Sequence, residues 1–189
     1  MSNDPLAKFV HWFASIAAEW NHCERTAQYI LAELLGATAT AHAVCCELKN
    51  VQLTNALNVA AELSEPDVKV AIKRFCESFE RMRVYRNFVI HGIQELPTET
   101  SARGAGIATL GTESGKGAFK TGTQNVNAGD LEAVSKTIQL TTRFGSQIYQ
   151  SLTTGSPQPS PDTLPLPTRM AKNSRSHPML QPQPESSGA

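Results

Sequence analysis

The sequence predicts an all-α protein, an up-and-down bundle of four to five helices with a short β-hairpin inserted before the last helix. Apolar residues recur at steps of three and four over most of residues 5–91 and again over 131–152, which is the period of amphipathic helices. A stretch rich in Gly, Thr and Ser, residues 97–126, separates these regions. The chain has 189 residues, 40% of them hydrophobic, which suffices for one domain with a core. We expect the bundle over residues 1–154, with the hairpin at about 103–124.

The first helix is predicted to begin at Asp4-Pro5, because an acceptor side chain followed by proline is a common helix start. Gly36 supplies the stop. Residues 38–63 continue with a helical period, and we expect a break near Lys49-Asn50. The apolar face of the first helix is formed by Phe9, Phe13, Ile16, Trp20, Cys23, Ala27, Ile30 and Leu34.

A second long helix is predicted over residues 66–91, capped by Ser64-Glu65-Pro66-Asp67 and ended by His91-Gly92. Its apolar stripe has one gap, which Arg86 fills, so Arg86 is expected near the middle of the buried face. A charge buried there needs a partner or an opening to water. In the alternative interpretation the stripe is rotated, Tyr85 takes the core position, and Arg86 lies at the edge with its head in water. The stripe consists of Val68, Ile72, Phe75, Phe79, Met82 and Val89.

Two short strands, at about 106–110 and 118–123, are expected to form the hairpin around residues 113–117. The segment from Gly111 to Gly117 resembles a phosphate-binding loop. However, its glycines are one residue too close, and a glycine stands where Ser or Thr would hold magnesium. The sequence therefore argues against nucleotide binding in this loop.

The last helix is predicted to start at Asn127 and Asp130, whose side chains suit a helix N-terminus. Its apolar positions are Leu131, Val134, Ile138, Phe144, Ile148 and Leu152. Residues 155–189 are rich in Pro, Ser and Gln and show no apolar period, so we expect a disordered tail.

Composition excludes several classes of protein. The formal net charge is zero, so charge alone indicates no partner. No stretch approaches 18 consecutive apolar residues and no secretory leader is recognisable, so we expect a cytoplasmic protein without a membrane partner. The four cysteines form no C-x-x-C pair and are expected to be small buried hydrophobes in a reducing compartment. Neither a metal site nor a cofactor is indicated.

The candidate functional residues are Arg86, Asn87 and His91. An Arg followed at once by Asn, with His five residues after the Arg, is expected by chance about 0.01 times in a chain of this composition. The surrounding helix is basic, with six Lys or Arg and two Glu between Lys69 and His91, which would suit a polyanion. Alternatively the cations belong to a solvated helix face that the helix dipole favours. The candidates for contacts with an RNA backbone are Lys73, Arg74, Arg81 and Arg83.

A helical bundle with Arg-Asn-x-x-x-His near the end of a late helix resembles the HEPN superfamily, the match being Arg86, Asn87 and His91. The resemblance covers roughly residues 5–153. It implies a metal-independent endoribonuclease that acts as a homodimer, with two motifs facing one cleft, in a toxin-antitoxin or defence setting with a protein antitoxin or regulator. His91 would be the general acid or base, Arg86 would stabilise the transition state, and Asn87 would orient the imidazole or a phosphate oxygen. Glu24, which would pair with a buried Arg86, and Tyr85 are the candidate supporting residues.

Two other interpretations stay open at this point. Bundles of this kind also serve as non-catalytic dimerisation or binding modules. In such a module Arg86 would pair with Glu24 or a partner carboxylate, and His91 would cap main-chain carbonyls. In the second interpretation the protein is an unrelated helical protein and the motif is a coincidence.

Overall fold

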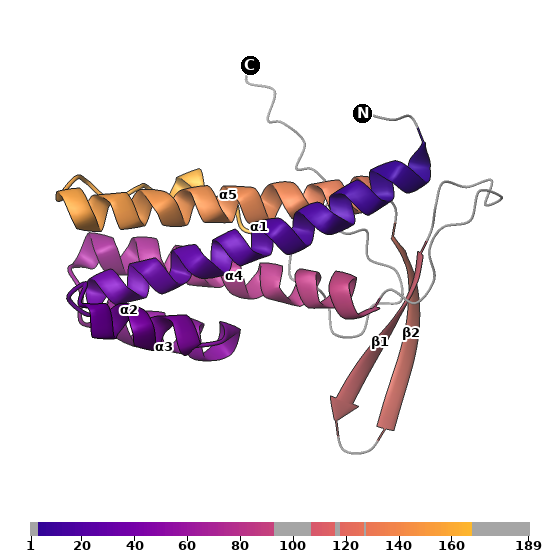
Figure 1. Ribbon diagram of the computed structural model, residues 1–189, viewed down its shortest axis with the longest axis horizontal. Helices are drawn as coiled ribbons and strands as arrows, with labels where there is room; N and C mark the ends of the chain where they lie inside the picture. The colour runs from indigo at the N-terminus through magenta and orange to yellow at the C-terminus, as the bar shows by residue number, and fades with distance from the viewer. Residues whose placement is uncertain (1–3, 93–106, 116–117, 127, 168–189) are drawn as a thin grey trace.

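The computed structural model describes residues 4–92, 107–115, 118–126 and 128–167 (Figure 1). For His91, Gly92 and the strand residues before Val126, only the course of the backbone is described. Five helices make up most of these residues, which confirms the predicted helical bundle of four to five helices. No helix among the described residues is both long enough and apolar enough to cross a bilayer.

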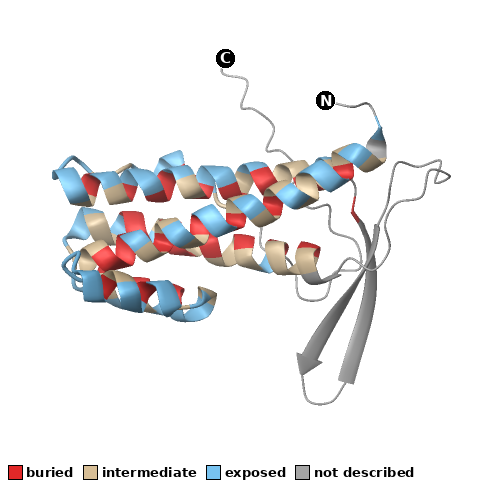
Figure 2. Ribbon diagram, in the orientation of Figure 1, coloured by how far each residue is buried: buried red, intermediate tan, exposed pale blue. Residues whose placement is uncertain are grey.

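Helix α1 spans Pro5–Leu34 and begins as its sequence predicts. The Asp4 carboxylate accepts a hydrogen bond from the Leu6 amide at 3.0 Å, and Pro5 occupies the first turn. The helix ends where Gly36 turns into the left-handed region at φ 92°. Most of its inward face is buried, as the red positions in Figure 2 show, whereas Phe13 and Leu34 are half-buried.

Two short helices follow, α2 over Ala39–Glu47 and α3 over Asn50–Glu62. The Thr38 hydroxyl caps α2 by accepting from the Ala41 amide at 3.1 Å. Leu48 and Lys49 adopt extended backbone angles, which separates the two helices at the predicted break. Helix α2 packs on α1, and α3 packs on both α1 and α4.

The core of the bundle lies among α1, α4 over Pro66–Gly92 and α5 over Ala128–Thr154. Ser15 and Glu19 of α1 bond to Ser135 and Gln139 of α5, so these two helices run in the same direction. Helix α4 runs opposite to α5, because Ser78 meets Thr141 while Phe75, earlier in α4, meets Gly145, later in α5. Aromatic rings fill the centre, with the centroids of Trp20 and Phe79 4.7 Å apart.

Between α4 and α5, strand β1 over Ile107–Gly115 pairs antiparallel with β2 over Ala118–Val126. The register runs from Ile107 opposite Val126 to Gly115 opposite Ala118. Val126 is buried and leads into α5. The remaining parts of the predicted insertion, residues 103–106 and 116–117, and the predicted cap Asn127 lie outside the described residues.

The structure differs from the sequence prediction after residue 154. Residues 155–167, which we call the C-terminal strap, fold back onto α4 instead of being disordered, and they include a short 3-10 turn at Pro161–Thr163. Leu164 is 1% exposed and belongs to the main core cluster. The composition misled because two residues of the segment, Leu164 and Pro167, are buried and anchor it without any apolar period. Residues 168–189 lie outside the described part of the chain.

Candidate functional site

The last two turns of α4 carry the candidate residues, and here the helix register differs from the first interpretation. Tyr85 is buried, with 3% of its surface exposed, whereas Arg86 is half-buried. The expectation that Arg86 lies in the middle of the buried stripe is therefore wrong. The core positions are Met82, Tyr85 and Val89, with steps of three and then four residues. These steps keep the residues on one face of the helix just as the predicted steps of four and then three would. An aromatic ring occupies that position at far lower cost than a charge.

Arg86 and Asn87 are joined by a hydrogen bond. The Arg86 Nη1 atom donates to Asn87 Oδ1 at 3.0 Å, and both residues are half-buried. Because the carboxamide oxygen accepts from Arg86, the amide NH2 group of Asn87 is left as a donor. Asn87 is neutral, so this bond orients the guanidinium without cancelling its charge.

His91 lies in the last turn of α4, one helical turn beyond Asn87. Its backbone position is as predicted, on the same side of the helix as Asn87, but its side chain lies outside the described residues. The structure thus brings Arg86 and Asn87 into contact and places the backbone of His91 beside them.

Glu24 does not accompany this group. Trp20 of α1 stacks on Phe79 of the antiparallel α4, so residues after Trp20 and residues after Phe79 move apart along the bundle. Glu24 is four residues past the first and Arg86 seven past the second, which separates them by about 16 Å along the helix axes at about 1.5 Å per residue. Glu24 is therefore no ion-pair partner of Arg86, so the predicted pairing of these two residues is wrong.

Tyr85, the other predicted supporting residue, contributes by packing. Burial raises the pKa of its phenol above the ordinary value, and the nearby charge of Arg81 opposes that rise. A buried phenol with a raised pKa stays protonated near neutral pH. Tyr85 holds the register that turns Arg86 toward the edge of the bundle.

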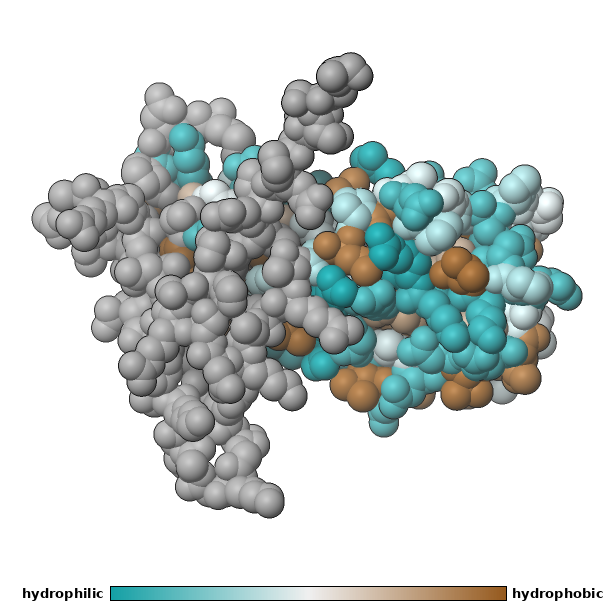
Figure 3. Space-filling model, turned by 180° about the vertical axis from the view of Figure 1, so that it is seen from behind, coloured by the Kyte–Doolittle hydropathy of each residue, from teal (hydrophilic) through white to brown (hydrophobic). Residues whose placement is uncertain are grey.

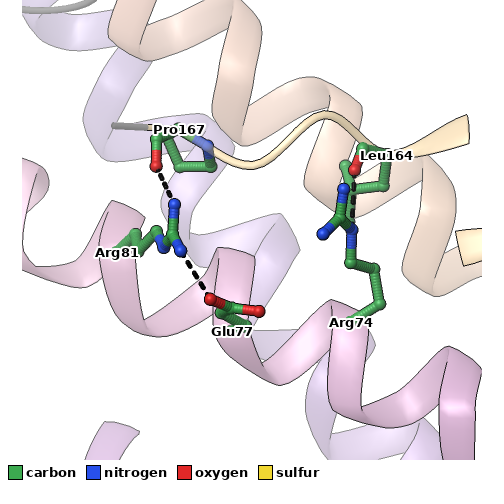
Figure 4. Close-up of polar contacts among 5 residues, drawn as sticks. All are labelled: Arg74, Glu77, Arg81, Leu164 and Pro167. Carbon is green, nitrogen blue, oxygen red and sulfur yellow. Dashed lines mark hydrogen bonds and ion pairs between the residues drawn. The ribbon is translucent and has the colours of Figure 1, made fainter. Parts of the chain in front are cut away.

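The four cations proposed for RNA contact all bind groups of the protein itself. Three are offset by carboxylates, and two meet main-chain carbonyls of the C-terminal strap (Figure 4). Most of the positive charges that make α4 basic in the sequence are therefore bound to other groups of the same protein. The pairs are Lys73 with Glu62 at 2.6 Å, Arg83 with Glu80 at 2.9 Å, Arg81 with Glu77 at 2.5 Å and with the Pro167 carbonyl, and Arg74 with the Leu164 carbonyl at 2.9 Å.

Sequence reasoning missed the strap as a structural element. Leu164 and Leu166 are the only non-proline apolar residues between 155 and 167, and two leucines among prolines were the available signal. Sequence reasoning also missed a groove between α3 and α4, with a volume of about 430 Å³. The groove is lined by Thr54, Asn58, Lys73, Cys76, Glu77, Glu80, Arg81 and Val84, and it does not include the residues of the motif.

Several large apolar residues are exposed, among them Leu63 at 86% and Val59 at 64%. On the face seen in Figure 3, hydrophobic side chains occur as separate patches among hydrophilic ones. Within the described residues, no three His, Cys, Asp or Glu side chains gather as they would around a metal ion.

Comparison of the chain with protein-family models, curated proteins and solved structures finds no match.

Proposed function

We propose that the C-terminal end of α4 binds the phosphodiester backbone of RNA and that the protein is a metal-independent endoribonuclease of HEPN type. The observation that carries the proposal is the hydrogen bond between Arg86 and Asn87. It sets a guanidinium and an amide NH2 group, both donors, side by side at a half-buried edge of the bundle. Adjacent N–H donors, one group of them belonging to a guanidinium, suit the oxygens of a phosphate.

The reaction is an attack of the RNA 2′-hydroxyl on the adjacent phosphorus. The bond from the 2′-oxygen to phosphorus forms and the bond from phosphorus to the 5′-oxygen breaks, leaving a 2′,3′-cyclic phosphate and a 5′-hydroxyl. His91 removes the proton of the 2′-hydroxyl, because a neutral imidazole is a base near neutral pH. The 5′-oxygen leaves with a proton from a general acid. Arg86 stabilises the charge that develops on the phosphate oxygens, and Asn87 fixes the guanidinium.

The single histidine of one motif serves as the base, so a second group is needed as the acid. A homodimer in which two copies of the α4 end face one cleft would supply it. The proposal therefore includes a homodimer in the cytoplasm, held in check by an antitoxin-like protein partner.

The test is cleavage of mixed-sequence RNA by the purified protein in EDTA. We expect wild-type protein to produce fragments with 5′-hydroxyl ends, which accept labelled phosphate from a polynucleotide kinase without prior phosphatase treatment. Arg86→Ala and His91→Gln should each lower the cleavage rate by about 100-fold or more, since a transition-state charge contact or a general base contributes about that factor.

Two residues of α1 provide matched controls, because Arg25 and His22 are exposed and carry the same functional groups. Arg25→Ala and His22→Gln should leave the rate unchanged. Loss of the ribonuclease hypothesis would follow if wild-type protein left RNA intact in EDTA, or if the control variants lost as much activity as the motif variants.

A further inference from the structure

The C-terminal strap is held on α4 through its main chain. Arg74 Nε donates to the carbonyl of Leu164 at 2.9 Å, and Arg81 Nη1 donates to the carbonyl of Pro167 (Figure 4). Glu77 holds the other guanidinium nitrogen of Arg81 at 2.5 Å, which fixes the fork toward the strap. Two arginines thus bind two main-chain carbonyl oxygens of one extended segment.

The spacing of the arginines matches that of the carbonyls. Arg74 and Arg81 are seven residues apart on one face of α4, about 10.5 Å at about 1.5 Å per residue. Leu164 and Pro167 are three residues apart, about 9.3 Å if the segment rises as a polyproline helix does, about 3.1 Å per residue. Leu164 has extended backbone angles, φ −109° and ψ 99°, and prolines are fixed near φ −65°. Two turns of the α-helix are therefore nearly as long as one turn of a polyproline helix.

The chemistry of the segment is complementary to arginine as well. Prolines 165 and 167 have no N–H group. The amides of Thr163 and Leu164 are already bonded to the carbonyls of Ser160 and Pro161, at 3.0 and 3.3 Å. What the segment presents to α4 is mainly acceptors, and a guanidinium has only donors.

A side-chain anchor completes the contact. Leu164 is 1% exposed and is part of the main core cluster, whereas the neighbouring Pro165 is exposed and Leu166 half-buried. Pro167 is buried as well, so Leu164 and Pro167 anchor the segment beside its paired main-chain contacts, the pattern by which folded domains recognise short extended peptides.

We propose that α4 carries a recognition site for extended peptides of the form Leu-Pro-x-Pro, and that residues 164–167 are its tethered ligand. The partner this surface fits is a proline-rich segment with a leucine at its start, read by Arg74 and Arg81. In the isolated chain the site is occupied by the strap, because a short tether gives a local concentration of about millimolar. A partner that carries the same pattern gains the site when the strap is released.

The experiment uses the full-length chain with the tethered ligand weakened by Leu164→Asp. The probe is a fluorescein-labelled peptide with the sequence of residues 156–167, and binding is followed by fluorescence anisotropy. We expect saturable binding to the Leu164→Asp protein and at least about tenfold weaker binding to wild type, whose strap competes. Adding Arg74→Ala to Leu164→Asp should weaken binding a further 10- to 100-fold, about what a charge-assisted hydrogen bond contributes.

Lys136→Ala is the matched control, because it removes an exposed cation that pairs with Glu132 of the same helix, α5, and it should not change peptide binding. A peptide that itself carries Leu164→Asp should not bind. The proposal is overturned if the folded Leu164→Asp protein, checked by circular dichroism, fails to bind the probe, or if Arg74→Ala leaves binding unchanged.

A second measurement covers the case in which Leu164→Asp does not fold. In Arg74→Ala and Arg81→Ala, hydrogen exchange at the amides of Thr163 and Leu164 should accelerate at least about tenfold while the amides of α1 keep their protection. Unchanged exchange in the strap would show that the arginines do not hold it and would overturn the proposal.

Discussion

Gly145 of α5 lies against side chains of both other long helices, Phe75 of α4 and Thr26 of α1, and replacing it by alanine tests that packing. A Cβ atom at this position would lie 2.6 Å from Cε2 of Phe75 and 2.8 Å from Cγ2 of Thr26. The Phe75 ring is fully buried, and its centroid is 5.9 Å from that of Phe79, so it has little room to move away. Gly145→Ala should therefore push α5 outward.

The expected cost follows from two opposing contributions. Overpacking a close-packed core typically costs about 1–3 kcal/mol. Alanine gains about 0.5–1 kcal/mol over glycine within a helix. We expect a net loss of about 1–2 kcal/mol in the free energy of unfolding, which lowers the melting temperature by about 2–8 °C for a protein of this size.

Urea unfolding followed by circular dichroism measures this loss, and the chain supplies the controls. Ser146→Ala, at the exposed neighbouring position of α5, should be neutral or slightly stabilising. Thr26→Ser removes the methyl group in the path of the new Cβ, so Gly145→Ala should cost less in that background. The packing argument is refuted if Gly145→Ala equals or exceeds wild type in stability.

Two further predictions rest on titratable groups. The pKa of Glu62 is held at about 2, below its ordinary 4.5, by hydrogen bonds and ion pairs to Lys69 and Lys73 of α4. The contribution of Glu62 to the free energy of unfolding is therefore present above about pH 4.5 and lost as pH falls toward 2. The difference in urea midpoint between wild type and Glu62→Gln should close over that interval. A difference that does not depend on pH would contradict this origin. Burial raises the pKa of the Cys23 and Cys76 thiols to about 12, whereas Cys46 is exposed, so a thiol-reactive disulfide at pH 8 should label one cysteine rapidly in the native protein. Cys46→Ser should abolish the rapid phase, and rapid labelling of a second thiol would count against the described core.

The long helices could be predicted because their local signals and their packing agree. The cap at Asp4-Pro5, the stop at Gly36 and the break at Leu48-Lys49 are encoded in neighbouring residues, and the structure has all three. The exact face of α4 could not be predicted in the same way. Tyr85 and Arg86 both continue an apolar period, and only the contacts with α1 and α5 decide which of them enters the core.

The position of the strap and the partners of the α4 cations could not be predicted, because both depend on contacts between residues far apart in the sequence. Nothing near Arg74 in the sequence points to a carbonyl 90 residues later, and a proline-rich segment lacks the periodicity by which burial is recognised. The burial of the cysteines could be predicted from the local sequence only in part. Cys23 and Cys76 lie on apolar stripes and are buried, but Cys46 follows the buried Cys45 and is turned to solvent by the 100° step of the helix, contrary to the prediction for all four.

The burial of Tyr85 changes what Arg86 requires. An arginine in the middle of the core would need a carboxylate inside the protein, and Glu24 lies too far along α1 to provide it. At the half-buried edge, Arg86 bonds to the carboxamide of Asn87, while the cations earlier in α4 bind Glu62, Glu77, Glu80 and the strap. A helix C-terminus repels anions through its dipole, so a phosphate there must be held by side chains alone. If the proposed function holds, Arg86→Ala and Asn87→Ala should therefore abolish RNA binding while circular dichroism shows that the helical fold is kept, because neither side chain belongs to the core.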